Sequence, residues 1–231
     1  MPVIARGRLL ALSAITFLAL LPVGAVEAGP PTDQLRSRVD RVLQLLADPE
    51  LAKDGRTAER RAAMRRIAGE VFDFTEISRR SLARHWQGRT AAEREEFVRL
   101  FGDLLERAYA SKIELYSGEK IDYLGELPDG DVTTVRTRII TKQGTPIPVD
   151  YRMFQQSGQW RAYDALIEGV SLVGNYRTQF NAVIQRSSYE GLVKALRAKL
   201  EEPAAARRAG KATAPVAEGA PASSLRGVQT P

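Results

Sequence analysis

The stretch KIDYLGELPDGDVTTVRTRIITKQGTPIPVDYRMFQQSGQWRAYDALIEG, residues 120–169, alternates apolar and polar side chains with the period of two typical of β-strands. In its third segment Ile147, Val149, Tyr151 and Met153 occupy every second position, which predicts one buried and one exposed face. Glycines at positions 130, 144 and 158 suit turns so short that neighbouring strands must be antiparallel. We therefore predict a four-stranded antiparallel sheet with strands at about 120–126, 131–142, 147–156 and 159–167.

Helical spacing of apolar residues flanks this sheet on both sides. Thr90-Ala91-Ala92-Glu93 and Ser187-Ser188-Tyr189-Glu190 have the spacing of capping boxes, and Ser171 is a candidate N-cap. The predicted helices are at about 32–46, 58–72, 75–83, 90–116, 171–186 and 188–200. The fold class is therefore α+β, with a helical N-terminal half, a curved four-stranded sheet and two C-terminal helices. Helices laid across a curved sheet leave a space between the two.

The two ends of the chain differ from this domain in composition. Arg6 and Arg8 precede an uncharged apolar run, Leu9–Leu21, and small residues follow it up to Ala28. This order is typical of a cleaved secretory signal, and the run is too short to span a bilayer. From residue 202 onward Ala, Gly, Pro, Ser and Thr dominate. We expect a signal peptide at 1–28, one domain at 29–201 and a disordered tail at 202–231.

The residue inventory excludes several kinds of chemistry. The chain has no cysteine, one histidine (His85) and a formal charge of +6 without a basic tract interleaved with aromatics, so disulfides, most metal sites and nucleic-acid binding are not expected. Asp164 and Glu168 lie four residues apart without a partner nucleophile, and Ser171 lacks a G-x-S-x-G frame. We therefore predict no catalytic residues, no metal and no cofactor, and hence no enzyme.

Aromatic and basic residues on neighbouring elements allow two interpretations each. Aromatic side chains such as Tyr109, Tyr151 and Phe180 either fill a core or line a cavity. Arg136, Arg138 and Arg152 either face solvent or meet a phosphate at the mouth of that cavity.

Several motifs resemble the MlaC family, also called toluene-tolerance proteins. They are Val149-Asp150-Tyr151-Arg152, Gly158-Gln159-Trp160-Arg161-Ala162-Tyr163-Asp164, Ile167-Glu168-Gly169-Val170-Ser171-Leu172-Val173 and, upstream, Phe72-Asp73-Phe74. The resemblance covers about residues 35–200. One departure is Ala83, where the family usually has a glycine after the leucine.

The resemblance implies a monomeric periplasmic shuttle with a fold related to the NTF2-like class. Such a protein carries phospholipid between an outer-membrane lipoprotein complex and an inner-membrane ABC transporter complex with its substrate-binding subunit, and so maintains outer-membrane lipid asymmetry. A hopanoid-lipid carrier of the same family and a periplasmic adaptor that binds no lipid remain open alternatives.

On this hypothesis the acyl chains lie in an apolar cavity between the long helix, the inner face of the sheet and the helix that follows Ser171. The predicted head-group residues are Arg138 and Arg152. The predicted lining residues are Phe101, Leu105, Tyr109, Val149, Tyr151, Trp160, Leu166, Val170, Leu172 and Phe180.

Overall fold

The computed structural model describes residues 30–51, 53, 55–116 and 118–202, so the predicted signal peptide and nearly all of the predicted tail lie outside the described residues. The fold is α+β, as predicted. The elements are α1 (Pro30–Ala47), α2 (Thr57–Val71), α3 (Phe74–Leu82), a short 3-10 helix η1 (Ala83–His85), α4 (Ala91–Glu114), β1 (Lys120–Asp129), β2 (Val132–Ile140), β3 (Pro146–Gln156), β4 (Gln159–Ile167), β5 (Val170–Ser171), α5 (Leu172–Arg186) and α6 (Tyr189–Glu201).

The sheet is an antiparallel meander in the order β1-β2-β3-β4-β5. The four predicted strands are confirmed, and the glycines at their turns have positive φ. The prediction missed β5, a two-residue strand that folds back on β4. Two bulges interrupt the ladder, between Tyr123 and Gly125 in β1 and opposite Arg152 and Met153 in β4. Each bulge shifts the alternation of faces by one residue.

Side-chain caps fix where the later helices begin. Thr90 and Glu93 form the predicted capping box of α4, and Ser171 caps α5 by accepting a hydrogen bond from the Gly174 N–H. The capping box predicted from Ser187 to Glu190 is wrong by one residue. The N-cap of α6 is Ser188, whose Oγ accepts from the Gly191 N–H at 3.1 Å.

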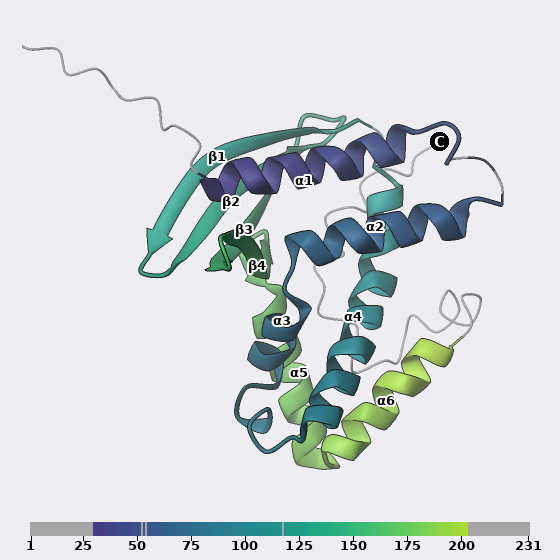
Figure 1. Cartoon of the computed structure of the whole chain (residues 1–231), viewed down its shortest axis with the longest axis vertical. Helices are drawn as coiled ribbons and strands as arrows, with labels where there is room; N and C mark the ends of the chain where they lie inside the picture. The colour runs from purple at the N-terminus through teal and green to yellow at the C-terminus, as the bar shows by residue number, and fades with distance from the viewer. Residues whose placement is uncertain (1–29, 52, 54, 117, 203–231) are drawn as a thin grey trace, which may run out of the picture.

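Buried apolar residues form two clusters. The helical cluster lies among α3, α4, α5 and α6 and includes Phe97, Phe101 and Phe180. The sheet cluster lies where α1 and α2 cover the sheet and includes Leu35 and Met153. The helix α4 runs upward past α2 (Figure 1). In its C-terminal half Leu104 and Leu105 belong to the helical cluster, and Tyr109 packs against that cluster.

Polar contacts hold α1 across the inner face of the sheet. The carboxylate of Glu126 accepts from the Thr32 N–H at 2.9 Å and so caps the positive end of the helix. The buried guanidinium of Arg38 donates to the carbonyl of Trp160 and to the side chain of Gln159, both at 2.6 Å. These bonds fix α1 at both β1 and the β3–β4 turn.

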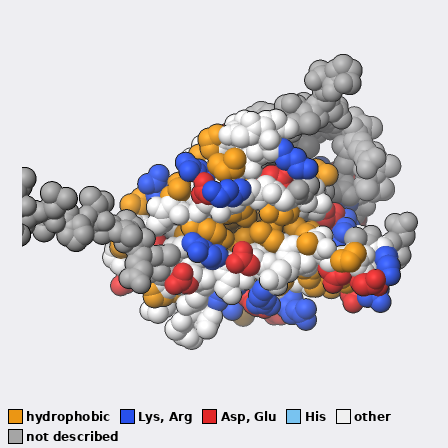
Figure 2. All heavy atoms as spheres, turned by 90° about the horizontal axis from the view of Figure 1, so that it is seen from above, with side chains coloured by type: hydrophobic (Ala, Val, Ile, Leu, Met, Phe, Trp, Pro, Cys, Tyr) orange, Lys and Arg blue, Asp and Glu red, His pale blue; other side chains and the backbone are white. Residues whose placement is uncertain are grey.

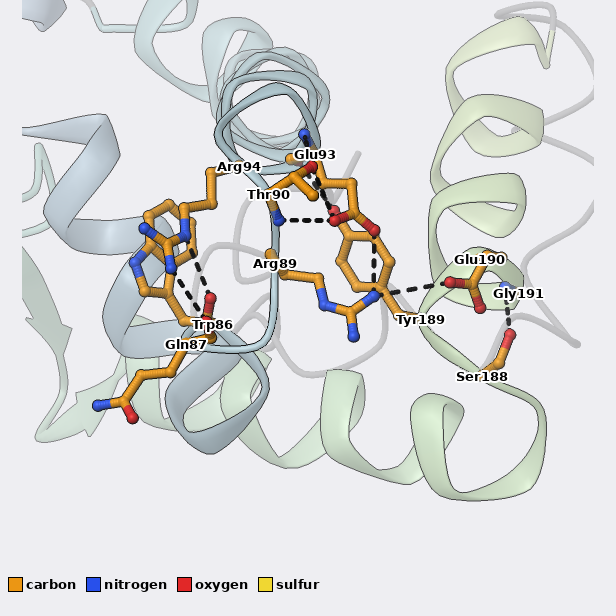
Figure 3. A network of polar contacts seen from close by, with 10 residues as sticks. All are labelled: Trp86, Gln87, Arg89, Thr90, Glu93, Arg94, Ser188, Tyr189, Glu190 and Gly191. Carbon is orange, nitrogen blue, oxygen red and sulfur yellow. Dashed lines mark hydrogen bonds and ion pairs between the residues drawn. The ribbon is translucent and has the colours of Figure 1, made fainter.

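A second polar network joins the start of α4 to the start of α6 (Figure 3). The guanidinium of Arg89 lies 3.1 Å from the carboxylate of Glu93 and 3.6 Å from that of Glu190, and its cation stands over the ring of Tyr189. The Tyr189 hydroxyl donates to the Glu93 carbonyl at 2.9 Å. The C-terminal helix is thereby fixed to the long helix at the far end from the sheet.

Candidate functional site

Aromatic side chains between the two clusters are desolvated but still partly accessible. Phe72 packs against both clusters, and its ring centroid lies 6.2 Å from that of Tyr151. Burial raises the pKa of the Tyr109 phenol, and it raises the pKa of Tyr151 to about 12. Both residues nevertheless retain accessible surface. We use the name central gap for the region marked by Phe72, Leu105, Tyr109, Val149 and Tyr151.

Two more phenols stand beside these residues. Burial raises the pKa of Tyr123, and the electrostatic effect of Tyr151 raises it further. Burial likewise raises the pKa of Tyr176, and the electrostatic effect of Tyr109 raises it further. The Tyr123 hydroxyl is buried and has no hydrogen-bond partner in the described part of the chain. Each of the two clusters therefore has phenols as well as hydrocarbon in its packing, Tyr123 and Tyr151 at the sheet cluster and Tyr109 and Tyr176 at the helical cluster.

The described part of the chain has two open grooves at its surface. The first, of about 610 Å³, lies between α1 and the β1–β2 edge of the sheet. The second, of about 720 Å³, lies between α2 and α4. Figure 2 shows hydrophobic side chains gathered in a band between two charged margins, on the side of the molecule occupied by α1 and the sheet in Figure 1.

Ion pairs connect α2 to α4 beside the second groove. The guanidinium of Arg61 lies 2.9 Å from the carboxylate of Glu114, and that of Arg65 lies 2.6 Å from the carboxylate of Glu106. These side chains bridge the two helices.

Four predicted lining residues divide between the two sides of the fold. Leu105 belongs to the helical cluster, and Tyr109 packs against it. Tyr151 packs against the sheet cluster, and Val149 is buried two positions before it on β3. Phe101 and Phe180 are fully buried inside the helical cluster, where their ring centroids lie 4.9 Å apart. Leu172 packs against the helical cluster and Trp160 against the sheet cluster.

The other two predicted lining residues lie elsewhere. Leu166 pairs with Asp150 and Ser171, which places it on the opposite face of the sheet from Val149 and Tyr151. The prediction for its face was wrong because the β4 bulge inserts one residue after Ala162 and reverses the alternation. Val170 is 47% exposed in β5.

Both predicted head-group arginines lie on the outer face of the sheet and already have carboxylate partners. The Arg138 guanidinium donates to Asp122 at 3.0 Å, at the first groove. The Arg152 guanidinium donates to Asp164 at 3.4 Å. A phosphate would have to compete with these carboxylates for either cation.

Asp164 has a structural role that its surroundings make clear. Its side chain is 2% exposed and accepts hydrogen bonds from the Ser171 hydroxyl at 2.6 Å and from the Val173 N–H at 3.0 Å. It thus caps α5 and ties the helical cluster to β4. The His85 ring lies 3.0 Å from the side chain of Asn181 and takes no part in the hydrogen bonds of Asp164.

Sequence reasoning missed Lys112, a cation on the apolar face of α4. Its ammonium lies 5.3 Å from the ring centroid of Tyr109, and burial lowers its pKa. Lys112 follows Leu105 by seven residues and Phe101 by eleven. At 3.6 residues per turn the side chains of Leu105 and Phe101 each point within about 20° of the direction of Lys112. That spacing was visible in the sequence.

Two kinds of feature are absent from the described ranges. Those ranges contain no group of three or more His, Cys, Asp or Glu side chains arranged to hold a metal ion. Within the same ranges no helix has the length and apolar character needed to cross a bilayer.

The meander sheet, the helices laid over it and the two apolar clusters define an α+β protein. The family model described as "MlaC protein" matches residues 36–198. The chain therefore belongs to the MlaC family, and the resemblance seen in the sequence is confirmed.

Individual relatives agree with this assignment. The chain is 28% identical over 127 residues to the "Intermembrane phospholipid transport system binding protein MlaC" of Haemophilus influenzae, an alignment that spans 53% of this chain and only 59% of the relative. It is 24% identical over 176 residues to "Toluene tolerance protein ttg2D" of Pseudomonas putida, covering 75% and 81% of the two chains.

A solved structure extends the likeness to three dimensions. A phospholipid-binding protein from Ralstonia solanacearum, determined in complex with a phospholipid, superposes with a TM-score of 0.61. The match covers 74% of this chain and 98% of the other, at 25% sequence identity. The shared fold is therefore one that holds a phospholipid in a related protein.

Proposed function

We propose that this chain is a periplasmic phospholipid-binding protein that carries lipid through water with the acyl chains in the central gap. The observation that carries the proposal is the set of desolvated yet accessible side chains, such as Tyr109 and Tyr151, between the two clusters. The bound phospholipid of the Ralstonia protein and the name of the Haemophilus relative support it.

The energetics of lipid transfer explain why a carrier needs such a gap. A diacyl phospholipid has on the order of 30 methylene groups, and each costs about 0.8 kcal/mol on exposure to water, so bare transfer costs on the order of 20 kcal/mol. A protein offsets this cost only if it offers the chains a comparable apolar surface. A filled core cannot do so, because its side chains already bury one another.

The finer part of the proposal concerns partners and location. The name of the Haemophilus relative places that protein in an intermembrane phospholipid transport system. By analogy, this chain is exported by its N-terminal signal and exchanges lipid between an outer-membrane lipoprotein complex and the substrate-binding subunit of an inner-membrane ABC transporter complex. In that position it acts as a carrier and catalyses no reaction.

Native mass spectrometry of the protein secreted by a Gram-negative host tests the central claim. The wild type is expected to carry the mass of one phospholipid. Tyr109→Glu, which places a charge in the central gap, is expected to be secreted and folded but empty. Leu127→Glu is the matched control, because Leu127 is 54% exposed on β1 and the same substitution there leaves lipid binding unchanged.

Three outcomes decide between the candidate functions. A wild-type protein free of lipid would favour an adaptor and overturn the proposal. A hopanoid mass in place of a phospholipid would keep the carrier and change its cargo. A full lipid load in Tyr109→Glu would show that the acyl chains lie elsewhere than the central gap.

A further inference from the structure

The apolar stripe of α4 ends in a cation. Phe101 and Leu105 are buried on this face, and Lys112 continues the same face two turns further toward the C-terminus. A lysine on the core side of a helix normally extends its ammonium to water or to a carboxylate. Lys112 does neither completely, since it is partly buried and its ammonium lies 5.3 Å from the ring centroid of Tyr109.

The carboxylates nearest in sequence on α4 are already engaged. Glu114 binds Arg61 and Glu106 binds Arg65, both across the α2–α4 contact. No carboxylate of the described residues pairs with Lys112. Desolvation lowers the pKa of Lys112.

The other lysines of the described ranges either pair with a carboxylate or are exposed to water. Lys53, Lys120 and Lys199 form ion pairs with Glu50, Asp122 and Glu202 at 2.6–2.9 Å. Lys142 and Lys194 are exposed, so water solvates their charges. Lys112 differs from both groups, because it is partly buried and has no carboxylate partner among the described residues.

We propose that Lys112 binds the phosphate group of a bound phospholipid whose acyl chains occupy the central gap. This inference rests on the proposed function and assigns the head-group contact to α4 rather than to Arg138 or Arg152. Its position suits a head-group contact, because Lys112 borders the gap through Tyr109 and lies one helical turn from the solvent-exposed end of α4 at Leu115. A phosphate there stays near water while its acyl chains extend toward Leu105.

The contact is a charge-assisted hydrogen bond, which is stronger than a neutral one. It distinguishes phospholipids from neutral diacylglycerols with the same chains, because only the former supply an anion. Loss of the ammonium should therefore cost about tenfold or more in relative binding of the phosphate-containing lipid. The apolar contribution of the acyl chains should remain.

The experiment compares two lipids with identical acyl chains. The delipidated, secreted protein is incubated with vesicles that contain equal amounts of phosphatidylglycerol and diacylglycerol, and native mass spectrometry measures the ratio of the two bound species. The wild type should favour phosphatidylglycerol. Lys112→Met should lower that ratio about tenfold, Lys112→Arg should preserve most of it, and the exposed control Lys194→Met should leave it unchanged.

Other results would overturn the inference. If Lys112→Met keeps the wild-type ratio of bound phosphatidylglycerol to bound diacylglycerol, or loses both lipids equally, the ammonium does not bind the phosphate group. If inorganic phosphate abolishes the preference without displacing lipid, the site is one for free anions rather than for a head group. If the wild type binds both lipids without preference, this inference alone fails; if it binds neither, the proposed function fails with it.

Discussion

Replacing Ala83 with glycine should stabilise this protein, although most substitutions destabilise. Ala83 follows α3 with φ 49° and ψ −120°, a backbone conformation that is strained for residues with a Cβ and free of strain for glycine. Its methyl group is exposed, so the substitution removes no packing. Its N–H continues to donate to the Arg79 carbonyl.

The magnitude follows from two opposing contributions. Relief of strain at one residue is worth about 1–3 kcal/mol. Glycine gives the unfolded chain more freedom, which costs about 0.4–1 kcal/mol. The net expectation is a gain of about 1 kcal/mol, or a rise in Tm of about 2–4 °C for a domain of this size.

Urea unfolding followed by circular dichroism measures the change. The midpoint should rise for Ala83→Gly with an unchanged m-value. Ala198→Gly is the control, because Ala198 is exposed within α6 and glycine there should cost about 1 kcal/mol. A fall in the midpoint for Ala83→Gly of the same size as the control would refute the claim that the backbone at residue 83 is strained.

Three further substitutions test the described contacts. Asp164→Ala removes a buried carboxylate that accepts two hydrogen bonds at the start of α5 and should lower the free energy of unfolding by about 3–5 kcal/mol in urea titration; a loss below about 1 kcal/mol would contradict this role. A hydrogen bond from Arg79 holds the pKa of Glu76 below its ordinary value of 4.5, so this pair contributes stability that is present above pH 4.5 and lost as the pH falls through the folded-state pKa. Tm measured against pH should therefore fall less steeply on acidification in Glu76→Gln, and parallel curves would rule the contribution out. In Gly191→Ala the new Cβ would lie 2.9 Å from the Ser187 Cβ, so unfolding should become easier by about 1–3 kcal/mol, whereas wild-type stability would show that the start of α6 adjusts freely.

The helices and strands of this fold could be predicted from the amino-acid sequence, because their signals are local. Strand alternation, turn glycines and the capping residues Thr90 and Ser171 act over a few residues, and each gave an element that the structure confirms. The same locality explains the small error at Ser187, where two adjacent serines compete for one cap. Membership of the MlaC family could also be recognised from the sequence, since the residues of each motif are contiguous in the chain.

Which side chains contact one another depends on how the elements pack, and the sequence did not predict it. The bulge after Ala162 places Leu166 on the opposite face of the sheet from the predicted one. No local sequence pattern predicted this bulge, because it depends on how β4 pairs with β3. The same holds for Phe101 and Phe180, which pack against each other, and for Lys112, whose environment is set by elements distant in sequence. Whether other side chains cover an apolar helix or strand face depends on packing between elements. The pattern of residues along one element cannot predict it.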